Sequence, residues 1–410
     1  MKTGTNRQQL ACNYIQDNYT AFNRLRFDTI AQKVQILRPD PATGEERWCY
    51  LTNADINSIV CDACAETGAA ITSREVLTVL NAGASYIPRV HPLRDYVNSL
   101  SPYTPDQTDW IDYVAQYVQV APESHDKWRV CFKKWFVGMV ASWLKPNIVN
   151  QSVLILVGQQ GIYKTTFLEY LIPPHLREYC CKMSNCSQIS KDDKLRLAEF
   201  GLINLDELDA MTPRELNVMK SIITTTDVTE RAAYAYTKEK RVRIASFCGS
   251  TNRREFLTDP SGNRRFLPFE CICIRSPYEI LFPYAGMYAQ ARYLIEHDFN
   301  YWFDLNDIQA LQEHTDSFRA RESEEELLPI LFDLPAEGKG HFLTTAQISE
   351  KLVTYGVVKH PMPLNRLGML LSANGYKQVR QRMGKQLCRG WIVYQRNSQE
   401  IEAMKHLLKQ

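Results

Sequence analysis

The strongest constraint on this chain is an apolar run, residues 152–157, that leads directly into a loop containing two glycines. Such a run is typical of a parallel strand that is covered on both faces. Similar runs recur at 201–205, 242–248 and 266–273, and helices are expected between them at 165–171, 191–199 and 212–223. This alternation of strands and helices predicts an α/β fold with a parallel sheet.

The loop that follows the first run has the composition of a phosphate-binding loop; it reads Gly158, Gln159, Gln160, Gly161, Ile162, Tyr163, Lys164, Thr165 and Thr166. Glycines let backbone N–H groups curve around phosphate oxygens, Lys164 would reach the β- and γ-phosphates, and the Thr165 hydroxyl would bind Mg²⁺. Tyr163 stands where the usual pattern has its second glycine. Tyrosine fits there only with a negative φ or with tolerated strain. The alternative is therefore a loop that binds ATP without hydrolysing it.

Three further segments agree with a nucleotide site. The run 201–205 ends in Asp206 and Glu207, where Asp206 would hold Mg²⁺ and Glu207 would activate the attacking water. Asn252 follows the run 242–248 and could hold the γ-phosphate or the water; the alternative is an asparagine that only forms a turn.

The third segment is a tight turn that carries Arg264 and Arg265 directly before the last run. Either arginine suits a finger that reaches the γ-phosphate on a neighbouring subunit, and an exposed basic turn is the alternative. Arg253 and Arg254 are weaker candidates, and spacing does not decide between Arg264 and Arg265.

Charge and composition suggest four regions. The chain of 410 residues has a net charge of +2, but residues 312–338 carry eight Asp/Glu against two Arg, and residues 341–410 carry eleven Lys/Arg against three Glu. We expect a mostly helical N-terminal region at 1–100 that acts as a collar or binds a partner, an ATPase core at 101–310, an acidic linker at 311–340 and a basic domain at 341–410. Within the first region, 34–37 and 48–51 flank a turn and predict a hairpin.

Two segments are candidates for contacting nucleic acid. Between Thr224 and Arg243, basic residues interleave with tyrosines, a pattern that suits phosphates and stacked bases; the alternative is a hairpin whose charges pair at a subunit interface. The second segment, 344–394, predicts two helices and a strand pair, the order of a winged helix that binds DNA or docks a protein. The DNA-binding candidates of the two segments are Arg231, Lys238, Lys240, Arg241, Lys377, Arg380, Arg382 and Lys385.

The order of these motifs resembles the virulence-associated protein E family over about residues 90–275. The resemblance implies a P-loop core of the AAA+ type, related to superfamily 3 helicases of phages and mobile elements. It also implies ATP with Mg²⁺, a homohexameric ring and DNA in the central channel. Family members often carry a primase domain, but residues 1–90 show no catalytic carboxylate cluster of that kind, so a separate primase is expected.

The leading hypothesis is therefore an ATP-dependent DNA helicase or translocase for the replication of a phage or mobile element. The alternative is a nucleotide-controlled oligomeric switch, regulatory or defensive, that does not unwind DNA. No stretch approaches the about 20 apolar residues that cross a bilayer, and the polar N-terminus lacks the apolar core of a signal peptide. We therefore expect a cytoplasmic location.

Overall fold

The computed structural model describes residues 6–41, 43–83, 85–183, 191–206, 208, 211–230, 239–257, 263–320, 323–336, 340–356, 358–359, 361–384 and 386–407. The chain divides into two compact units, Met1–Phe318 and Arg319–Gln410. Its fold is mixed α/β with a parallel sheet, as the alternation of apolar runs predicted. In the described part of the chain, no helix is long and apolar enough to cross a membrane.

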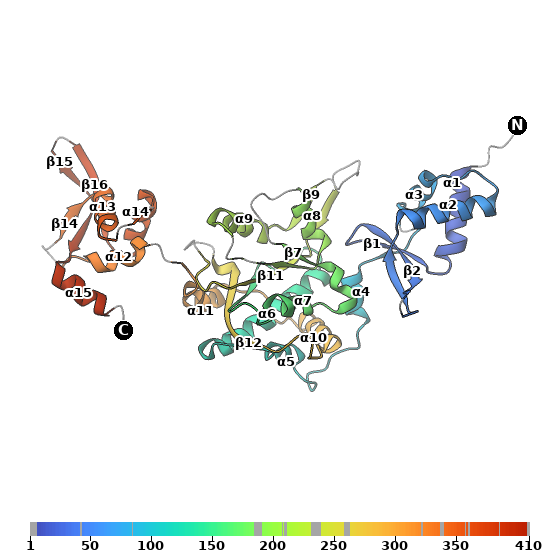
Figure 1. Ribbon diagram of the computed structural model, residues 1–410, viewed down its shortest axis with the longest axis horizontal. Helices are drawn as coiled ribbons and strands as arrows, with labels where there is room; N and C mark the ends of the chain where they lie inside the picture. The colour runs from blue at the N-terminus through green and yellow to red at the C-terminus, as the bar shows by residue number, and fades with distance from the viewer. Residues whose placement is uncertain are drawn as a thin grey trace. The chain divides into compact units, whose positions relative to one another are not determined.

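A six-stranded sheet organises the larger unit, in the order β5-β12-β6-β11-β8-β7. Its strands β7, β11 and β12 can be found by their labels in Figure 1. The strands are β5 (Val118–Val120), β6 (Val153–Val157), β7 (Cys180–Met183), β8 (Leu202–Leu205), β11 (Ser246–Thr251) and β12 (Phe266–Ile274). All neighbours pair in parallel except β5, which is antiparallel to β12. The chain leaves β6 toward β7 on one side and later returns to β12 on the other. In such sheets, ligands bind beyond the carboxyl ends of the strands at this switch point.

Helices cover both faces of this sheet, which explains why the predicted runs lack polar alternation. Leu154 and Leu156 of β6 pack with helices on one face, whereas Val153, Ile155 and Val157 pack with helices on the other. The helices of this layer are α4 (Pro92–Ser99), α5 (Trp110–Ala115), α6 (His125–Leu144), α7 (Lys164–Tyr170), α8 (Lys191–Glu199), α9 (Pro213–Ile223), α10 (Tyr284–Glu296) and α11 (Leu305–Asp316).

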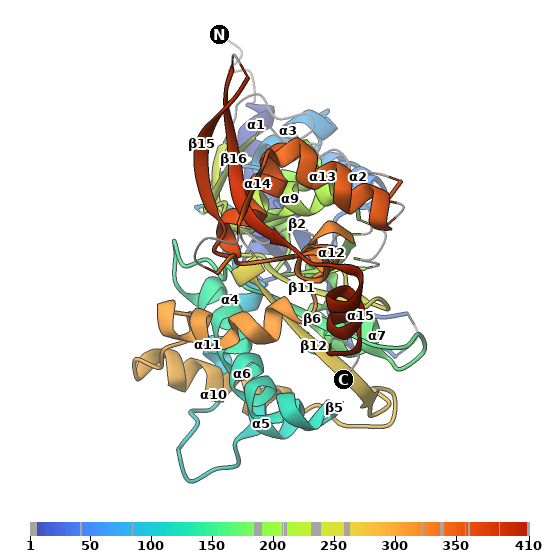
Figure 2. The same cartoon turned by 90° about the vertical axis from the view of Figure 1, so that its left-hand side faces the viewer.

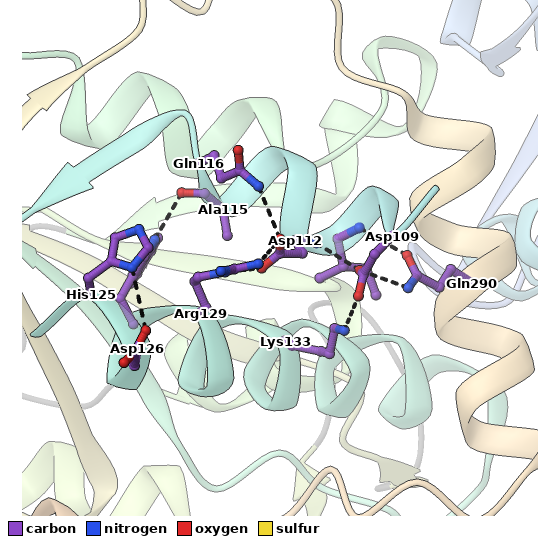
Figure 3. Close-up of polar contacts among 11 residues, drawn as sticks. Asp109, Asp112, Ala115, Gln116, His125, Asp126, Arg129, Lys133 and Gln290 are labelled. Carbon is purple, nitrogen blue, oxygen red and sulfur yellow. Dashed lines mark hydrogen bonds and ion pairs between the residues drawn. The ribbon is translucent and has the colours of Figure 1, made fainter. Parts of the chain in front are cut away.

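A polar network fastens α5 to its neighbours on the α6 side of the sheet (Figure 3). Asp112 forms an ion pair with Arg129 of α6, and Asp109 accepts hydrogen bonds from Lys133 of α6 and, at 2.8 Å, from Gln290 of α10. The hydrogen bond from Arg129 lowers the pKa of Asp112. Because each carboxylate is already matched by a cation of the same chain, we interpret this network as structural.

The N-terminal part of this unit has its own small core and a four-stranded sheet in the order β3-β2-β1-β4. Its elements are α1 (Arg7–Ile15), the π-helical turn Gln16–Thr20, β1 (Leu25–Asp28), β2 (Lys33–Pro39), β3 (Glu46–Tyr50), α2 (Asn53–Thr67), α3 (Ser73–Leu80) and β4 (Arg89–Val90). The predicted hairpin is confirmed, with Leu37 opposite Trp48. The buried Asp28 accepts hydrogen bonds from Tyr50 (3.1 Å) and from Tyr179 (2.6 Å), which precedes β7, so it links the two sheets.

The predicted strand 242–248 is wrong in its extent. A two-stranded ribbon of β9 (Asp227–Glu230) and β10 (Glu239–Val242) ends before β11 begins. Between β10 and β11 lies the fully buried Arg243, whose guanidinium donates to backbone carbonyls, including those of Ile223 (2.5 Å) and Asn150 (3.1 Å). Burial lowers its pKa to about 9. A buried cation needs hydrogen-bond acceptors. Because the Arg243 side chain points to these carbonyl groups, the chain leaves the strand geometry at this residue.

The smaller unit packs around Leu328, Leu352, Leu367 and Trp391. Its elements are α12 (Ser323–Leu331), β13 (Phe332–Asp333), β14 (His341–Leu343), α13 (Thr345–Gly356), α14 (Leu364–Ala373), β15 (Lys377–Met383), β16 (Gln386–Gln395) and α15 (Ser398–Leu407). The predicted pair of helices followed by a strand pair is therefore present. Figure 2 shows β15 and β16 as a long ribbon.

Candidate functional site

Lys164 lies at the carboxyl edge of the central sheet, in the mouth of its own loop. Its side chain is only 7% exposed. Its Nζ donates to the carbonyl oxygens of Gly158 (2.8 Å) and Gln159 (2.6 Å) and to Oδ1 of Asn252 (3.0 Å). Asn252 follows β11, the strand beside β6, so the parallel register brings both strand ends to the same ammonium group. An anionic oxygen could replace these neutral oxygen partners with a stronger, charge-assisted hydrogen bond.

A cluster of three oxygen-bearing side chains lies beside this lysine. Oδ1 of Asp206, directly after β8, accepts hydrogen bonds from Thr165 Oγ1 (3.2 Å) and from Ser250 Oγ (3.1 Å). The two hydroxyl oxygens are 3.0 Å apart. Carboxylate and hydroxyl oxygens are ligands that Mg²⁺ accepts together with phosphate oxygens and water. Thr165 and Asp206, the two predicted metal ligands, are thus brought together in a set that fits this ion.

The loop backbone shows why its glycines are needed and what Tyr163 does to it. Gly158 has a φ of +157°, and a Cβ there would lie 2.7 Å from the carbonyl oxygen of Cys271 on β12, so the site requires glycine. Tyr163 has a φ of +68° and a ψ of +19°, in the left-handed region that costs an L-residue about 1–2 kcal/mol. Of the two possibilities that the sequence left, tolerated strain is therefore the one found.

The remaining loop residues have simple surroundings. Gln159, Gln160 and Gly161 are exposed, and Gly161 also has a positive φ of +88°. Ile162 packs against the core of the sheet, which anchors the loop. Thr166 is half-buried in the first turn of α7. Glu207, the predicted base, lies outside the described residues.

Arg264 and Arg265 lie at the opposite edge of the sheet. They belong to the short turn Asn263–Arg265 before β12, whose first residue is paired with the first residue of β6. The length of a five-residue strand, about 13 Å, separates that edge from the loop. The two arginines are therefore not brought together with Lys164 and Asn252 in one chain.

A cavity of about 330 Å³ opens beside these arginines and is also lined by Asn150, Tyr301 and Trp302. Burial and the neighbouring Arg264 lower the pKa of Arg265. Among the described residues, neither arginine has an ion-pair partner.

The preceding residue, Asn263, is 5% exposed, and its side-chain oxygen and nitrogen both lack a hydrogen-bond partner in the described part of the chain. It lines a second cavity of about 200 Å³ together with Arg264. Buried amides are almost always hydrogen-bonded. At this edge of the sheet, the described residues therefore leave hydrogen-bonding groups without partners.

The β9–β10 ribbon carries two of the predicted DNA-binding residues. Lys240 forms an ion pair with Asp227 (3.2 Å) and stays largely exposed, whereas Arg241 is mostly buried and bound to Glu199 of α8 (2.9 Å). Arg231 and Lys238 lie outside the described residues. Within the described part, the exposed cation of the ribbon is therefore Lys240.

The β15–β16 ribbon displays Lys377, Arg380 and Arg382, all exposed. Arg380 lies directly opposite Arg389, a residue not among the predicted DNA-binding candidates, and β14 pairs with residues 391–393 of β16. Like charges directly opposite each other destabilise a ribbon, so an anion bound between Arg380 and Arg389 would relieve their repulsion. Lys385 lies outside the described residues.

Two residues of the site were missed from the sequence. Ser250 stands two positions before Asn252, and since alternate residues of a strand share a face, this spacing could have indicated it. Asn204 is fully buried on β8, and its Nδ2 donates to the carbonyl oxygen of Thr165 at 3.4 Å. An asparagine inside an otherwise apolar run was the available signal.

One comparison with known proteins, the scan against family models, agrees with the motif order. The model of the virulence-associated protein E-like domain matches residues 100–320. No curated protein matches the chain. Among solved structures, the apo structure of the NrS-1 C-terminal region (305–718) is 12% identical with a TM-score of 0.49, covering 95% of this chain and 99% of that one. An A-form apo structure of the same region is 11% identical with a TM-score of 0.47, covering 94% and 99%. Since the family model spans more than half of its length, the chain belongs to the virulence-associated protein E-like domain family.

Proposed function

We propose that this chain is an ATP-hydrolysing P-loop enzyme of the AAA+ type that binds its nucleotide at residues 158–166. One observation carries this proposal: the ammonium of Lys164, the Thr165–Asp206 oxygen pair and Asn252 converge at the carboxyl edge from the loop and two neighbouring strands. A cation beside a metal-ligand pair is the arrangement that a nucleoside triphosphate with Mg²⁺ needs.

The residues would divide the chemistry among them. Lys164 would bind the β- and γ-phosphates, Thr165 and Asp206 would hold Mg²⁺, and Asn252 would orient the γ-phosphate or the attacking water. Bound Mg²⁺ would neutralise charge on the phosphates. Glu207 follows Asp206 in the sequence and would accept the proton of the water.

The remaining charge would come from a second copy of the chain. Arg264 or Arg265 would reach the γ-phosphate bound by the neighbouring subunit, because in its own chain each lies a strand length from the loop. Such a contact joins two different surfaces of identical chains, and it closes into a ring when the rotation permits. The family resemblance implies six subunits.

DNA would be the substrate of the ring. Lys240 and Arg241, with Arg231 and Lys238, would bind strand phosphates in the channel, and Lys240 is the more exposed of the first two. The smaller unit would act as a winged helix whose ribbon uses Lys377, Arg380, Arg382 and Lys385. The opposed pair Arg380–Arg389 supports this assignment.

The function that these parts support best is an ATP-dependent DNA helicase or translocase in phage or mobile-element replication, working with a separate primase. Its test is strand displacement from a forked DNA, with ATP and Mg²⁺, by the chain and by Lys164→Ala and Glu207→Gln. We expect the parent chain to displace the strand and neither variant to do so. ATP hydrolysis that DNA does not stimulate, without displacement, would instead favour the nucleotide-controlled switch.

A further inference from the structure

Tyr163 occupies a position where the backbone favours glycine, directly before Lys164. Unfavourable backbone conformations persist where the surrounding structure fixes them, and they cluster at ligand sites. The ring of Tyr163 is 40% exposed, so core packing does not account for the residue. Its side chain therefore needs an explanation at the surface beside the phosphate loop.

The Tyr163 ring is held by a second exposed aromatic residue. It meets the ring of Tyr278 at 6.1 Å between centroids and at 81°, and Tyr278 in turn meets Tyr170 at 5.7 Å and 82°. Both contacts have the edge-to-face geometry that aromatic pairs favour. Tyr170 is fixed from below, because the Arg177 guanidinium lies 3.7 Å from its ring centroid and Phe282 packs against it at 6.1 Å. Tyr278 is thus oriented by a half-buried neighbour while 68% of its own surface stays exposed.

An exposed, oriented aromatic pair, one member of which directly precedes the buried Lys164 in the chain, matches a ligand with a flat aromatic head and an anionic tail. Nucleotides have this form, since every base presents a π-face that stacks on aromatic side chains. We propose that Tyr163 and Tyr278 form the nucleobase platform of the site, a role that rests on the proposed nucleotide binding at Lys164. Stacking on these rings involves the face of a base and not the hydrogen-bonding groups on its edge. The platform would therefore favour any base that stacks and would not distinguish one base from another.

Binding of nucleotides and of inorganic tripolyphosphate to the full chain, in the presence of Mg²⁺, tests this role by calorimetry. Tripolyphosphate has the anionic tail without the base. We expect Tyr278→Ala to weaken ATP and GTP binding about 10-fold and to leave tripolyphosphate binding unchanged, while Tyr278→Phe keeps the parent affinities. Phe22→Ala, which removes a ring of the same exposure (69%) far along the sequence, should leave all affinities unchanged.

A second variant, Tyr163→Gly, restores the residue that the backbone favours. We expect it to keep or raise the melting temperature while it lowers ATP affinity relative to tripolyphosphate. The platform would be overturned if Tyr278→Ala lost both ligands equally, because the ring would then only support the loop, or if it lost neither. A parent chain that binds neither ATP nor tripolyphosphate would overturn the proposed nucleotide site and the platform with it.

Discussion

The carboxyl edge of the central sheet and the opposite edge, which carries Arg264 and Arg265 and is called the arginine edge below, differ in how many of their polar groups have partners within one chain. At the carboxyl edge, Lys164 and Asp206 are surrounded by partners from their own chain. At the opposite edge, Arg264 and Arg265 have no ion-pair partner among the described residues, and the amide of Asn263 is buried without a hydrogen bond. The first edge is the proposed nucleotide site, and the second presents two cations for which the described residues supply no anion.

This difference indicates how a second copy would bind. Unmatched buried polar groups cost about 1–3 kcal/mol each, so an association that supplies their partners gains that amount. The nucleotide that we propose at the carboxyl edge of one subunit would supply the anion that the described residues do not supply at the arginine edge of the next. The comparison therefore predicts a head-to-tail contact in which each site uses residues of two chains.

The largest expected effect comes from the arginine edge. Replacing the proposed finger residue, by Arg264→Ala or Arg265→Ala, should lower the rate of ATP hydrolysis about 1,000-fold, since a trans arginine would stabilise the transition-state charge. Steady-state hydrolysis measures the effect, and nucleotide binding should stay within about twofold because the carboxyl edge is untouched. The variant with the larger loss identifies the finger. Unchanged hydrolysis in both would remove this edge from the site.

A smaller loss is expected at the carboxyl edge when its carboxylate is neutralised. Asp206→Asn keeps the shape of the side chain but weakens the proposed metal ligand, so hydrolysis should fall about 100-fold and recover in part at raised Mg²⁺. Titration of activity against Mg²⁺ checks this. Ser250→Ala, which removes a hydroxyl from the same cluster, is the matched control and should cost about 10-fold or less. A loss in Asp206→Asn that is independent of Mg²⁺ would argue against a metal role.

The stability of the carboxyl edge can be tested at two glycines of the loop. Gly158→Ala places a Cβ 2.7 Å from a carbonyl oxygen of β12 and should lower the free energy of unfolding by about 2–4 kcal/mol. Gly161→Ala meets no atom within 4 Å but keeps a positive φ, so its cost should be about 1 kcal/mol. Chemical denaturation compares the two. Equal losses would mean that the approach of β12 does not shape the loop.

The smallest expected effect is a loss of stability at low pH. It arises at α4, whose contacts reach the start of β8 through Trp143. The His91 ring accepts the hydrogen bond that caps α4, and Arg94 of that helix binds the Trp143 carbonyl while the Trp143 indole binds Gly201 before β8. Burial lowers the pKa of His91 to about 4. The unfolded chain, with an ordinary pKa near 6.5, therefore binds more protons between about pH 6.5 and 4. Stability is complete above this window and is lost as the pH falls through it.

We expect a loss of about 1–3 kcal/mol in the free energy of unfolding between pH 7 and pH 4 from this residue. His91→Asn keeps a cap that does not titrate, so it should flatten the pH dependence by that amount. Denaturation curves at both pH values compare the variant with the parent. An identical pH dependence in the two would show that His91 is not the titrating group.

Local patterns were enough to predict the centre of the fold and of the candidate site. The apolar run and the loop after it placed β6 and α7 within one residue, because a doubly covered strand leaves an unbroken apolar signal. The short strands β5 and β7 lack such a signal and were missed. The break at Arg243 depends on carbonyl groups distant in the sequence, so no local pattern contains it. Backbone strain at Tyr163 was one of the two alternatives predicted, but its positive φ can be known only from the backbone structure.

The shared site between two copies is tested most directly by co-expressing two differently tagged variants, Lys164→Ala and the double variant Arg264→Ala/Arg265→Ala, and purifying the mixed assembly through both tags. Each variant alone should hydrolyse ATP at background rate. In a mixed ring, a subunit with an intact lysine sits beside one with intact arginines at about a quarter of the interfaces, so we predict about a quarter of the parent activity. A mixed assembly that remains at the background rate would contradict a site built from both edges.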